Sequence, residues 1–312
     1  MRTISLSIIV RRAVLSCTVL ACGIPLVSLS RAKWGEVGHR LTAQAAAAAL
    51  PSDMPAFFRN AAPQLAYLNP EPDRWRSRQE QDRDPALGVS SAADHFIDTE
   101  MIPADRRSNA FAARTRNAYA DTLRALGVNA EVAGFLPFRI LELTQTLRIE
   151  FGLWRSAPDA KTREWIEARI INDAGILGHY VADGSNPAHT SVQFNGWVGA
   201  NPHGYATDKR FHSRFESTYV QAELTLEDVQ PLVGSTARVF PELRPAILSY
   251  LNETFSEVEH LYQLDKAAPF DAGTTSAEDK QFTAARLAAG SRMLRDLWWT
   301  AWITSGDSAS PR

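Results

Sequence analysis

A spaced series of histidines and acids constrains this chain more than any other feature of its sequence. Two pairs in the series have i, i+4 spacing, His179 with Asp183 and His212 with Glu216. On a helix this spacing places both side chains on one face, about 5–6 Å apart, so one helix can offer two ligands to one metal ion. The whole series predicts a site for several metal ions, and its members are Trp34, His39, Asp73, His95, His179, Asp183, His189, His212 and Glu216.

The metal interpretation depends on the combined pattern and not on any single residue. A lone histidine is usually a hydrogen-bonded core or surface residue, and a lone His–Glu pair on a helix is usually a solvated face. Here His-x3-Asp-x5-His is followed by His-x3-Glu, which is too extensive for that explanation. Both cysteines, Cys17 and Cys22, precede residue 34. Beyond it, disulfides and thiolate sites are excluded, so histidine, carboxylate or backbone groups must hold any metal.

The first 33 residues differ from the rest of the chain. They contain five cations, no acid and an apolar run over residues 13–29 that follows Arg11-Arg12. This layout is typical of an export signal, and the paired arginines favour the twin-arginine route. A membrane anchor is the alternative, but a run of about 17 residues that contains glycine and proline is short for spanning a bilayer. We therefore expect an export signal over residues 1–33 and a periplasmic or extracellular mature protein.

The remaining residues, 34–312, carry a net negative charge. Of the 33 Lys and Arg, 28 remain once the five of the signal are removed, and they face 35 Asp and Glu, a formal charge of −7. A protein that grips duplex DNA through its backbone is normally basic, so a broad electrostatic footprint for duplex is absent. Several bound divalent cations would nevertheless make a single cleft positive.

The apolar pattern of residues 34–312 predicts helices throughout. Apolar residues recur at spacings of three and four, and alternating β-branched runs are missing. We expect an all-α fold, a single multi-helix domain over 34–312, with the helices at 37–50, 109–126, 136–154, 165–183, 246–262 and 277–302. The longest irregular stretch, Thr190 to Phe211, connects His189 to His212. A loop of this length in a compact domain is usually functional, so we expect it to form a wall of the metal cleft.

These motifs resemble those of a known superfamily, the zinc-dependent phospholipases C and the single-strand-specific zinc nucleases (the S-one/P-one nuclease family). The resemblance covers most of the chain after residue 33. It implies an all-α fold that holds three zinc ions. The motifs that carry it are residues 34–39 (WGEVGH), 73–76 (DRWR), 95–98 (HFID), 179–189 (HYVADGSNPAH) and 212–216 (HSRFE).

The resemblance also implies how the ligands divide among the three ions. One zinc would take Asp73, His95, His179 and Asp183. Its neighbour would take His39, the second oxygen of Asp183, and the free amine and carbonyl of Trp34 as the mature N-terminus. The third would take His189, His212 and Glu216.

The implied chemistry is phosphodiester hydrolysis. A hydroxide that bridges the two zinc ions at Asp183 would attack phosphorus, and Arg76 would neutralise charge on the phosphoryl oxygens. In the nuclease interpretation, Phe96 would stack on a base, Asp98 would accept hydrogen bonds from it, and Asn201 would contribute to base recognition. The expected substrate is single-stranded DNA or RNA, with 5′-phosphorylated products. No stable protein partner is implied, and we expect a monomer.

Two alternatives stay open at this point. Nuclease-like features include the short separation of Trp34 from His39 and the long gap from His189 to His212. Glu216 instead resembles the phospholipases, because the nucleases usually have Asp there, so cleavage of phospholipid head groups is the first alternative. A non-catalytic periplasmic zinc-binding protein is the second. It would apply if cleavage before Trp34 does not occur and the remaining metals are structural.

Overall fold

The computed structural model describes residues 34–308, and every regular element in that range is a helix. The expectation of an all-α fold is therefore confirmed. The predicted export signal, residues 1–33, lies outside the described residues. The longer helices are α1 (Glu36–Ala48), α8 (Arg116–Ala125), α10 (Leu136–Arg155), α11 (Ala160–Asp183), α14 (Leu226–Val233), α15 (Leu243–Phe255), α16 (Val258–Ala267) and α17 (Ala277–Thr304).

Short helices connect these long ones. The shorter α-helices are α2 (Ala56–Asn60), α3 (Ala62–Leu68), α4 (Glu71–Arg74), α5 (Arg78–Arg83), α6 (Ala86–Ala92), α7 (Arg107–Phe111), α9 (Ala130–Ala133), α12 (Phe211–Ser213) and α13 (Val220–Glu223). The 3-10 turns are η1 (Ala93–His95), η2 (Thr99–Met101), η3 (Pro187–His189) and η5 (Ser305–Ser308), and one π-helical segment, η4, spans Arg214–Tyr219. The irregular stretch predicted between His189 and His212 is present as a loop over residues 190–210.

Local capping explains where several helices begin. Asp159 accepts a hydrogen bond from the Thr162 backbone at 2.8 Å at the start of α11, and Ser276 caps α17 in the same way. Thr115 caps α8 and thereby divides the predicted run 109–126 into α7 and α8. The predicted run 246–262 is likewise divided, because α15 ends at Phe255. The hydroxyl of Ser256 there donates to the Glu253 carbonyl and competes with helix continuation.

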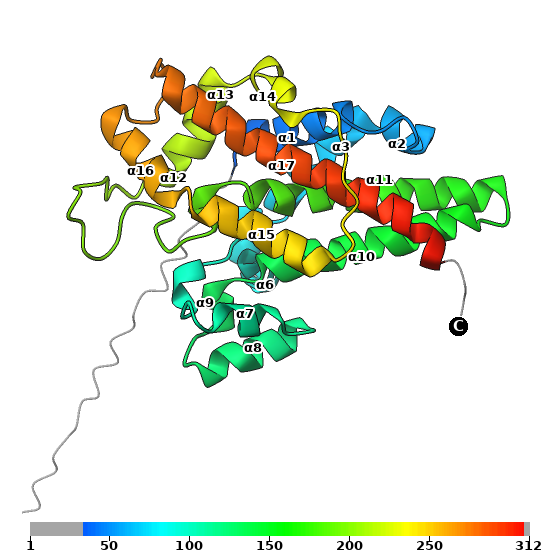
Figure 1. Ribbon diagram of the computed structural model, residues 1–312, viewed down its shortest axis with the longest axis horizontal. Coiled ribbons are helices and arrows are strands. Elements are labelled where there is room, and N and C mark those ends of the chain that lie inside the picture. Colours follow the sequence, from blue (N-terminus) through cyan, green and yellow to red (C-terminus); the bar gives the residue numbers. More distant parts are fainter. Residues whose placement is uncertain (1–33, 309–312) are drawn as a thin grey trace, which may run out of the picture. The chain divides into compact units, whose positions relative to one another are not determined.

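The longest helix, α17, packs against α1, α10 and α11 (Figure 1). Buried apolar side chains form two clusters. One is built mainly from α10, α11, α15 and α17, and the other from α1, α13, α14, α16, α17 and the η4 segment. The last turn of α11 reaches both clusters, since Val181 belongs to the first and Ala182 to the second. The next residue is Asp183, which therefore lies where the two cores meet.

Candidate metal centre

The last turn of α11 carries two of the predicted ligands. His179 and Asp183 are one helical turn apart, and Nε2 of His179 lies 3.3 Å from Oδ2 of Asp183. Both side chains are fully buried. Neighbouring Gly178 lets another segment approach this turn, because a Cβ there would lie 2.3 Å from the side-chain nitrogen of Asn69. The i, i+4 pair thus faces inward, as the spacing predicted.

Asn69, just after α3, contacts the histidines of both α1 and α11. Its side-chain oxygen is 3.1 Å from Nδ1 of His39, and its backbone carbonyl is 2.9 Å from Nδ1 of His179. A carbonyl can only accept, so Nδ1 of His179 must donate, and Nε2 is the nitrogen of that ring that can bind a metal ion in place of a proton. The two imidazoles stack with their centroids 4.0 Å apart.

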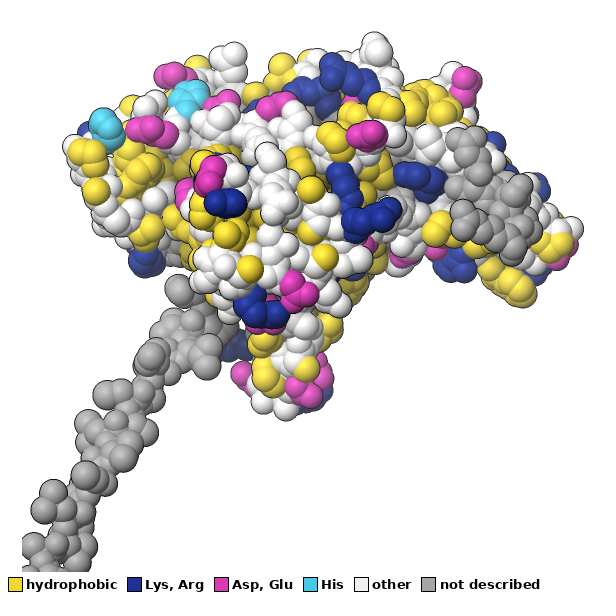
Figure 2. Space-filling view, turned by 60° about the horizontal axis from the view of Figure 1, so that its bottom comes forward, with side chains coloured by type: hydrophobic (Ala, Val, Ile, Leu, Met, Phe, Trp, Pro, Cys, Tyr) yellow, Lys and Arg dark blue, Asp and Glu magenta, His cyan; other side chains and the backbone are white. Residues whose placement is uncertain are grey.

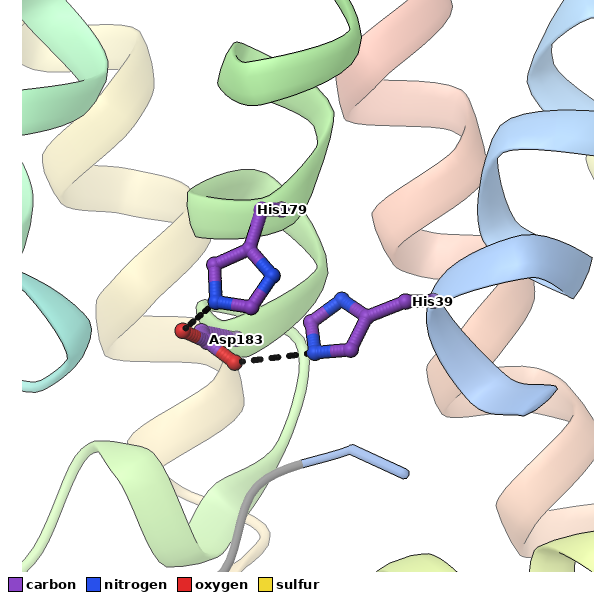
Figure 3. A group of neighbouring side chains, drawn as sticks. All are labelled: His39, His179 and Asp183. Atoms are coloured by element: carbon purple, nitrogen blue, oxygen red, sulfur yellow. Dashed lines mark ion pairs between the residues drawn. The ribbon is translucent and has the colours of Figure 1, made fainter. Parts of the chain in front are cut away.

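The carboxylate of Asp183 is surrounded by imidazoles on both sides. Oδ2 lies 2.8 Å from Nδ1 of His95 and 3.3 Å from Nε2 of His179. Oδ1 lies 3.6 Å from Nε2 of His39 and 3.7 Å from Nδ1 of His189. Figure 3 shows His39 and His179 approaching opposite oxygens of this one carboxylate. Asp183 can therefore serve two neighbouring metal positions at once.

Asp73 and His95 complete the group on the Oδ2 side. Asp73, on α4, has Oδ1 3.4 Å from Nε2 of His179 and Oδ2 4.0 Å from Nε2 of His39. His95 ends η1, and its Nδ1 lies 3.0 Å from Nε2 of His179. The side chain of Asp73 is 27% exposed, whereas those of His39, His179 and Asp183 are fully buried. This part of the site opens to solvent at Asp73.

A separate cluster joins three predicted ligands from shorter elements. Nε2 of His212 lies 2.9 Å from Oε2 of Glu216 and 3.2 Å from Nε2 of His189, and the His189 nitrogen lies 3.4 Å from the same oxygen. The His212–Glu216 pair was expected on an α-helix. His212 is on α12, but Glu216 is in the π-helical segment η4, a conformation that is rare and occurs often at functional sites.

Backbone contacts tie the two parts of the site together. Nδ1 of His189 donates to the His95 carbonyl at 2.7 Å, and the amide of Ile97 donates to the His189 carbonyl at 2.9 Å. As with His179, the carbonyl partner fixes the proton on Nδ1 and leaves the Nε2 lone pair of His189 facing Glu216. A shift of either segment would disturb both clusters.

The electrostatics of the site reflect buried charge. Burial opposes a charge on His179, but the carboxylates of Asp183 and Asp73 outweigh it and raise its pKa to about 9. Burial likewise opposes ionisation of Asp183, yet His179 and His189 outweigh it, so the pKa of Asp183 is well below its ordinary value. For Glu216, burial is the dominant effect and raises the pKa to about 8.

The donor set fits divalent metal ions. Three groups of side chains could each hold an ion, because the ligand atoms within a group lie within 4.8 Å of one another. The groups are His39, His179 and Asp183; Asp73, His95 and His179; and His189, His212 and Glu216. Oδ1 of Asp183 and Oε1 of Glu216 are buried and accept no hydrogen bond from the described residues. A buried carboxylate oxygen without a donor is unfavourable, and a cation would relieve it. A site of nitrogen and oxygen ligands suits zinc.

Two further predicted residues flank this centre. The indole of Trp34 is fully buried against Phe215, with ring centroids 5.3 Å apart, and the Gly35 amide donates to the Glu216 carbonyl at 3.2 Å. This places the segment beside the η4 ligand, while the role of the Trp34 backbone as a ligand stays a prediction. Arg76 donates its backbone amide to the Asp73 carbonyl at 3.1 Å. Arg76 as a whole residue is half-buried, and its side chain forms no ion pair within residues 34–308.

The three residues assigned to substrate binding lie in different surroundings. Phe96 follows His95 directly and Asp98 lies three residues after it, and both are buried, with 6% and 3% of each residue exposed. Asn201 lies in the 190–210 loop, where its side chain exchanges two hydrogen bonds with the Tyr205 backbone at 2.8 and 2.9 Å. The amide of Asn201 is therefore used to close its own loop, and contact of these residues with a substrate stays a prediction.

Two asparagines at the site were not found by sequence reasoning. Asn69 contacts His39 and His179, and Nδ2 of Asn186 donates to Oε2 of Glu216 at 3.1 Å. Both precede proline, a pattern that indicates a turn. The available signal was Gly178, since glycine within a helical pattern often marks close packing.

Comparison with solved structures found a similarity for this chain. No family model matches the chain, and no curated protein matches it. Among solved structures, the chain is similar to the crystal structure of the Clostridium perfringens alpha-toxin isolated from an avian strain, with 13% sequence identity and a TM-score of 0.42. The match covers 89% of this chain and 66% of the toxin chain, so the chain spans just under two thirds of the length of that toxin. Within residues 34–308 no helix is long and apolar enough to cross a membrane.

Proposed function

We propose that this protein is a zinc-dependent phosphodiester hydrolase that acts on single-stranded DNA or RNA. The observation that carries the proposal is the position of Asp183, whose two oxygens face His95 and His179 on one side and His39 and His189 on the other. Such a carboxylate suits two adjacent cations, the arrangement used for in-line displacement at phosphorus. The ligands around Asp183, together with the Glu216 cluster (His189, His212 and Glu216), support a site for three zinc ions.

Zinc, when bound, supplies Lewis acidity toward phosphate oxygens and lowers the pKa of water to near neutrality. The chain's own residues orient and shield this chemistry. The buried imidazoles of His39, His179 and His189 are held with their Nε2 atoms inward, so little reorganisation is needed on binding. The exposed edge of Asp73 is where a phosphodiester would reach the centre, and Arg76, three residues further on, would offset charge on its oxygens.

Charge and neighbouring residues support a single-stranded nucleic acid as the substrate. Residues 34–312 have a formal charge of −7, and on the face seen in Figure 2 basic and acidic side chains are interspersed and form no continuous basic surface. Such a surface is unsuited to gripping duplex by its phosphates, whereas a flexible strand can bring one phosphate to a buried centre. Phe96 and Asp98, adjacent to His95, would contact the base.

One observation favours phospholipid as a second candidate substrate. The helices α6 and α9 both pack against η1, which carries His95, and they expose large apolar side chains. Leu87 and Val89 on α6 are 52% and 66% exposed, and Val132 on α9 is 48% exposed. Exposed apolar side chains beside a metal centre that hydrolyses phosphodiesters would contact the acyl chains of a phospholipid substrate.

A side-by-side turnover assay separates these possibilities. The mature protein should contain about three zinc ions by elemental analysis, lose activity with a chelator, and cleave single-stranded DNA and RNA faster than duplex, leaving 5′-phosphates. Much faster cleavage of phosphatidylcholine would establish the phospholipase instead. Zinc binding without turnover of any phosphodiester would leave the non-catalytic zinc-binding protein. We also propose that the protein is exported and acts as a monomer, which N-terminal sequencing and light scattering of the mature protein would test.

A further inference from the structure

We propose that Asn69 is a positioning residue that holds His39 for metal binding, with its side chain and backbone acting on different histidines. The inference rests on the proposed zinc centre. The side-chain oxygen of Asn69 lies 3.1 Å from Nδ1 of His39, and its backbone carbonyl accepts from Nδ1 of His179 at 2.9 Å. One residue thus contacts the outer nitrogens of two rings whose inner nitrogens face Asp183.

The surroundings of Asn69 indicate that the side chain is not there to stabilise the fold. It is fully buried, and its Nδ2 makes no hydrogen bond with the described residues. Burying an amide NH2 without an acceptor is unfavourable, and an apolar side chain of similar size would avoid that penalty. Gly178 accommodates this same nitrogen, because a Cβ there would lie 2.3 Å from it. The acceptor oxygen toward His39 is the contact that requires asparagine.

The two contacts of Asn69 predict an uneven effect of substitution. Replacing the side chain removes the acceptor for His39 but leaves the carbonyl that accepts from His179. The metal group that contains His39 should therefore weaken most, and the group of Asp73, His95 and His179 should weaken less. The Glu216 cluster, which Asn69 does not contact, should be unaffected.

Asn186 provides a matched control at the other cluster. It is also fully buried, its Nδ2 donates to Oε2 of Glu216 at 3.1 Å, and its Oδ1 accepts from the Ala188 amide at 3.0 Å in the turn that carries His189. Substituting Asn186 should weaken the Glu216 cluster and leave the His39 group intact. The two asparagines should thus affect different ions.

The test compares Asn69→Leu and Asn186→Leu with the wild type, each as the mature full chain. Zinc per molecule is measured by elemental analysis, and zinc affinities are measured by chelator competition. The visible absorption of Co²⁺ bound in place of zinc reports the ligands at the sites. In N69L we expect one ion to bind roughly 10–100-fold more weakly, the usual effect of losing a residue behind a histidine ligand. Asn69→Asp, which keeps the acceptor oxygen, should restore binding. If N69L does not fold by circular dichroism, Asn69→Ala gives the same comparison.

Wild-type affinity for all three ions in N69L, or loss of the same ion in N69L and N186L, would overturn this inference alone. A wild-type protein that binds no zinc would overturn the inference and the proposed function together, so the two failures are distinguishable.

Discussion

The two parts of the metal centre are built from different kinds of structure. His39, His179 and Asp183 project from the long helices α1 and α11, which pack against each other and against α17. His189, His212 and Glu216 come instead from η3, α12 and the π-helical segment η4, none longer than six residues. The first group owes its geometry to helix packing, while the second depends on side-chain and backbone contacts that hold short segments in place.

The carboxylates at the two centres also differ in what surrounds them. Four imidazoles approach the two oxygens of Asp183, and their charge outweighs burial, so its pKa is lowered. At Glu216, His189 and His212 approach one oxygen, and burial dominates and raises the pKa to about 8. At Glu216 the negative charges of Asp183 and Asp73 add to the effect of burial, whereas imidazoles outweigh burial at Asp183.

Asp183→Asn should have the largest effect, because this carboxylate is proposed to serve two ions. Zinc content should fall from about three ions to about one, and turnover should fall by more than the roughly 10–100-fold expected for a residue behind a ligand. Elemental analysis and the single-stranded DNA assay measure both. Asp105→Asn, on an exposed residue that pairs with its neighbour Arg106 at 3.1 Å, is the control. Wild-type activity in D183N would show that Asp183 does not bridge two ions.

Glu216→Gln should remove only the third ion. About two zinc ions should remain, and turnover should fall less than in D183N, because the two ions beside Asp183 keep all their ligands. The exposed Glu242→Gln variant serves as the matched control. Loss of all zinc in E216Q would mean that the two parts of the centre bind metal as one unit. The backbone bonds between residues 95–99 and 189–190 would then be the connection.

Extra residues before Trp34 should affect one part of the centre only. If the free amine of Trp34 is a ligand beside His39, a chain extended by a few residues should lose that ion and most of its turnover. The Glu216 ion and the unfolding temperature should stay the same. Tagged and untagged mature forms can be compared by zinc content and calorimetry. Equal activity of the two forms would exclude the Trp34 amine as a ligand.

The difference between the two parts also explains what could be predicted from the sequence. The His179–Asp183 pair, the helix that carries it and its end at Asp183 followed from periodicity, because an α-helix fixes which residues share a face. Breaks within helices were missed at Thr115 and Ser256. There, a single hydroxyl side chain bonds to nearby backbone and changes the path of the chain.

Contacts between segments distant in sequence were beyond such reasoning. Asn69 lies 30 residues from His39 and 110 from His179. The periodicity of a helix or a strand relates residues only within one element, so no sequence pattern marks these two contacts. The π-helical turn at Glu216 was missed for a related reason. The i, i+4 spacing indicates an α-helix, but the segment is held by its neighbours, with Phe215 packed between Trp34 and Phe270 at centroid distances of 5.3 and 4.8 Å.

Phe96→Ala should have a smaller effect, limited to substrates that contain a base. If Phe96 stacks on a nucleobase, KM for polynucleotides should rise by the equivalent of about 1–3 kcal/mol, and a small phosphodiester without a base should be affected less. Phe111→Ala is a suitable control, since Phe111 is 7% exposed and belongs to the apolar core. It should lower stability with KM unchanged. An equal rise of KM for both substrates in F96A would assign Phe96 to packing behind His95.

Glu150→Gln should have the smallest effect, on stability alone, because Glu150 belongs to none of the metal groups. Glu150 is 5% exposed, its Oε1 lies 3.1 Å from Nε of Arg169, and its Oε2 accepts no hydrogen bond from the described residues. Burial, and then nearby Asp173, raise its pKa from the ordinary 4.5 to about 7. An acid whose pKa is higher in the folded state favours folding below pH 4.5, and this contribution is lost as the pH rises through about 7.

Glutamine resembles the protonated acid at every pH, so E150Q should melt a few degrees above the wild type at pH 8, roughly the shift that 1–2 kcal/mol gives a chain of this size. The difference should shrink toward pH 5, where the wild-type side chain is itself protonated. Scanning calorimetry at the two pH values measures this, and any release of zinc at low pH affects both proteins alike. A lower melting temperature for E150Q at pH 8 would mean that the ion pair with Arg169 outweighs the burial of the Glu150 charge.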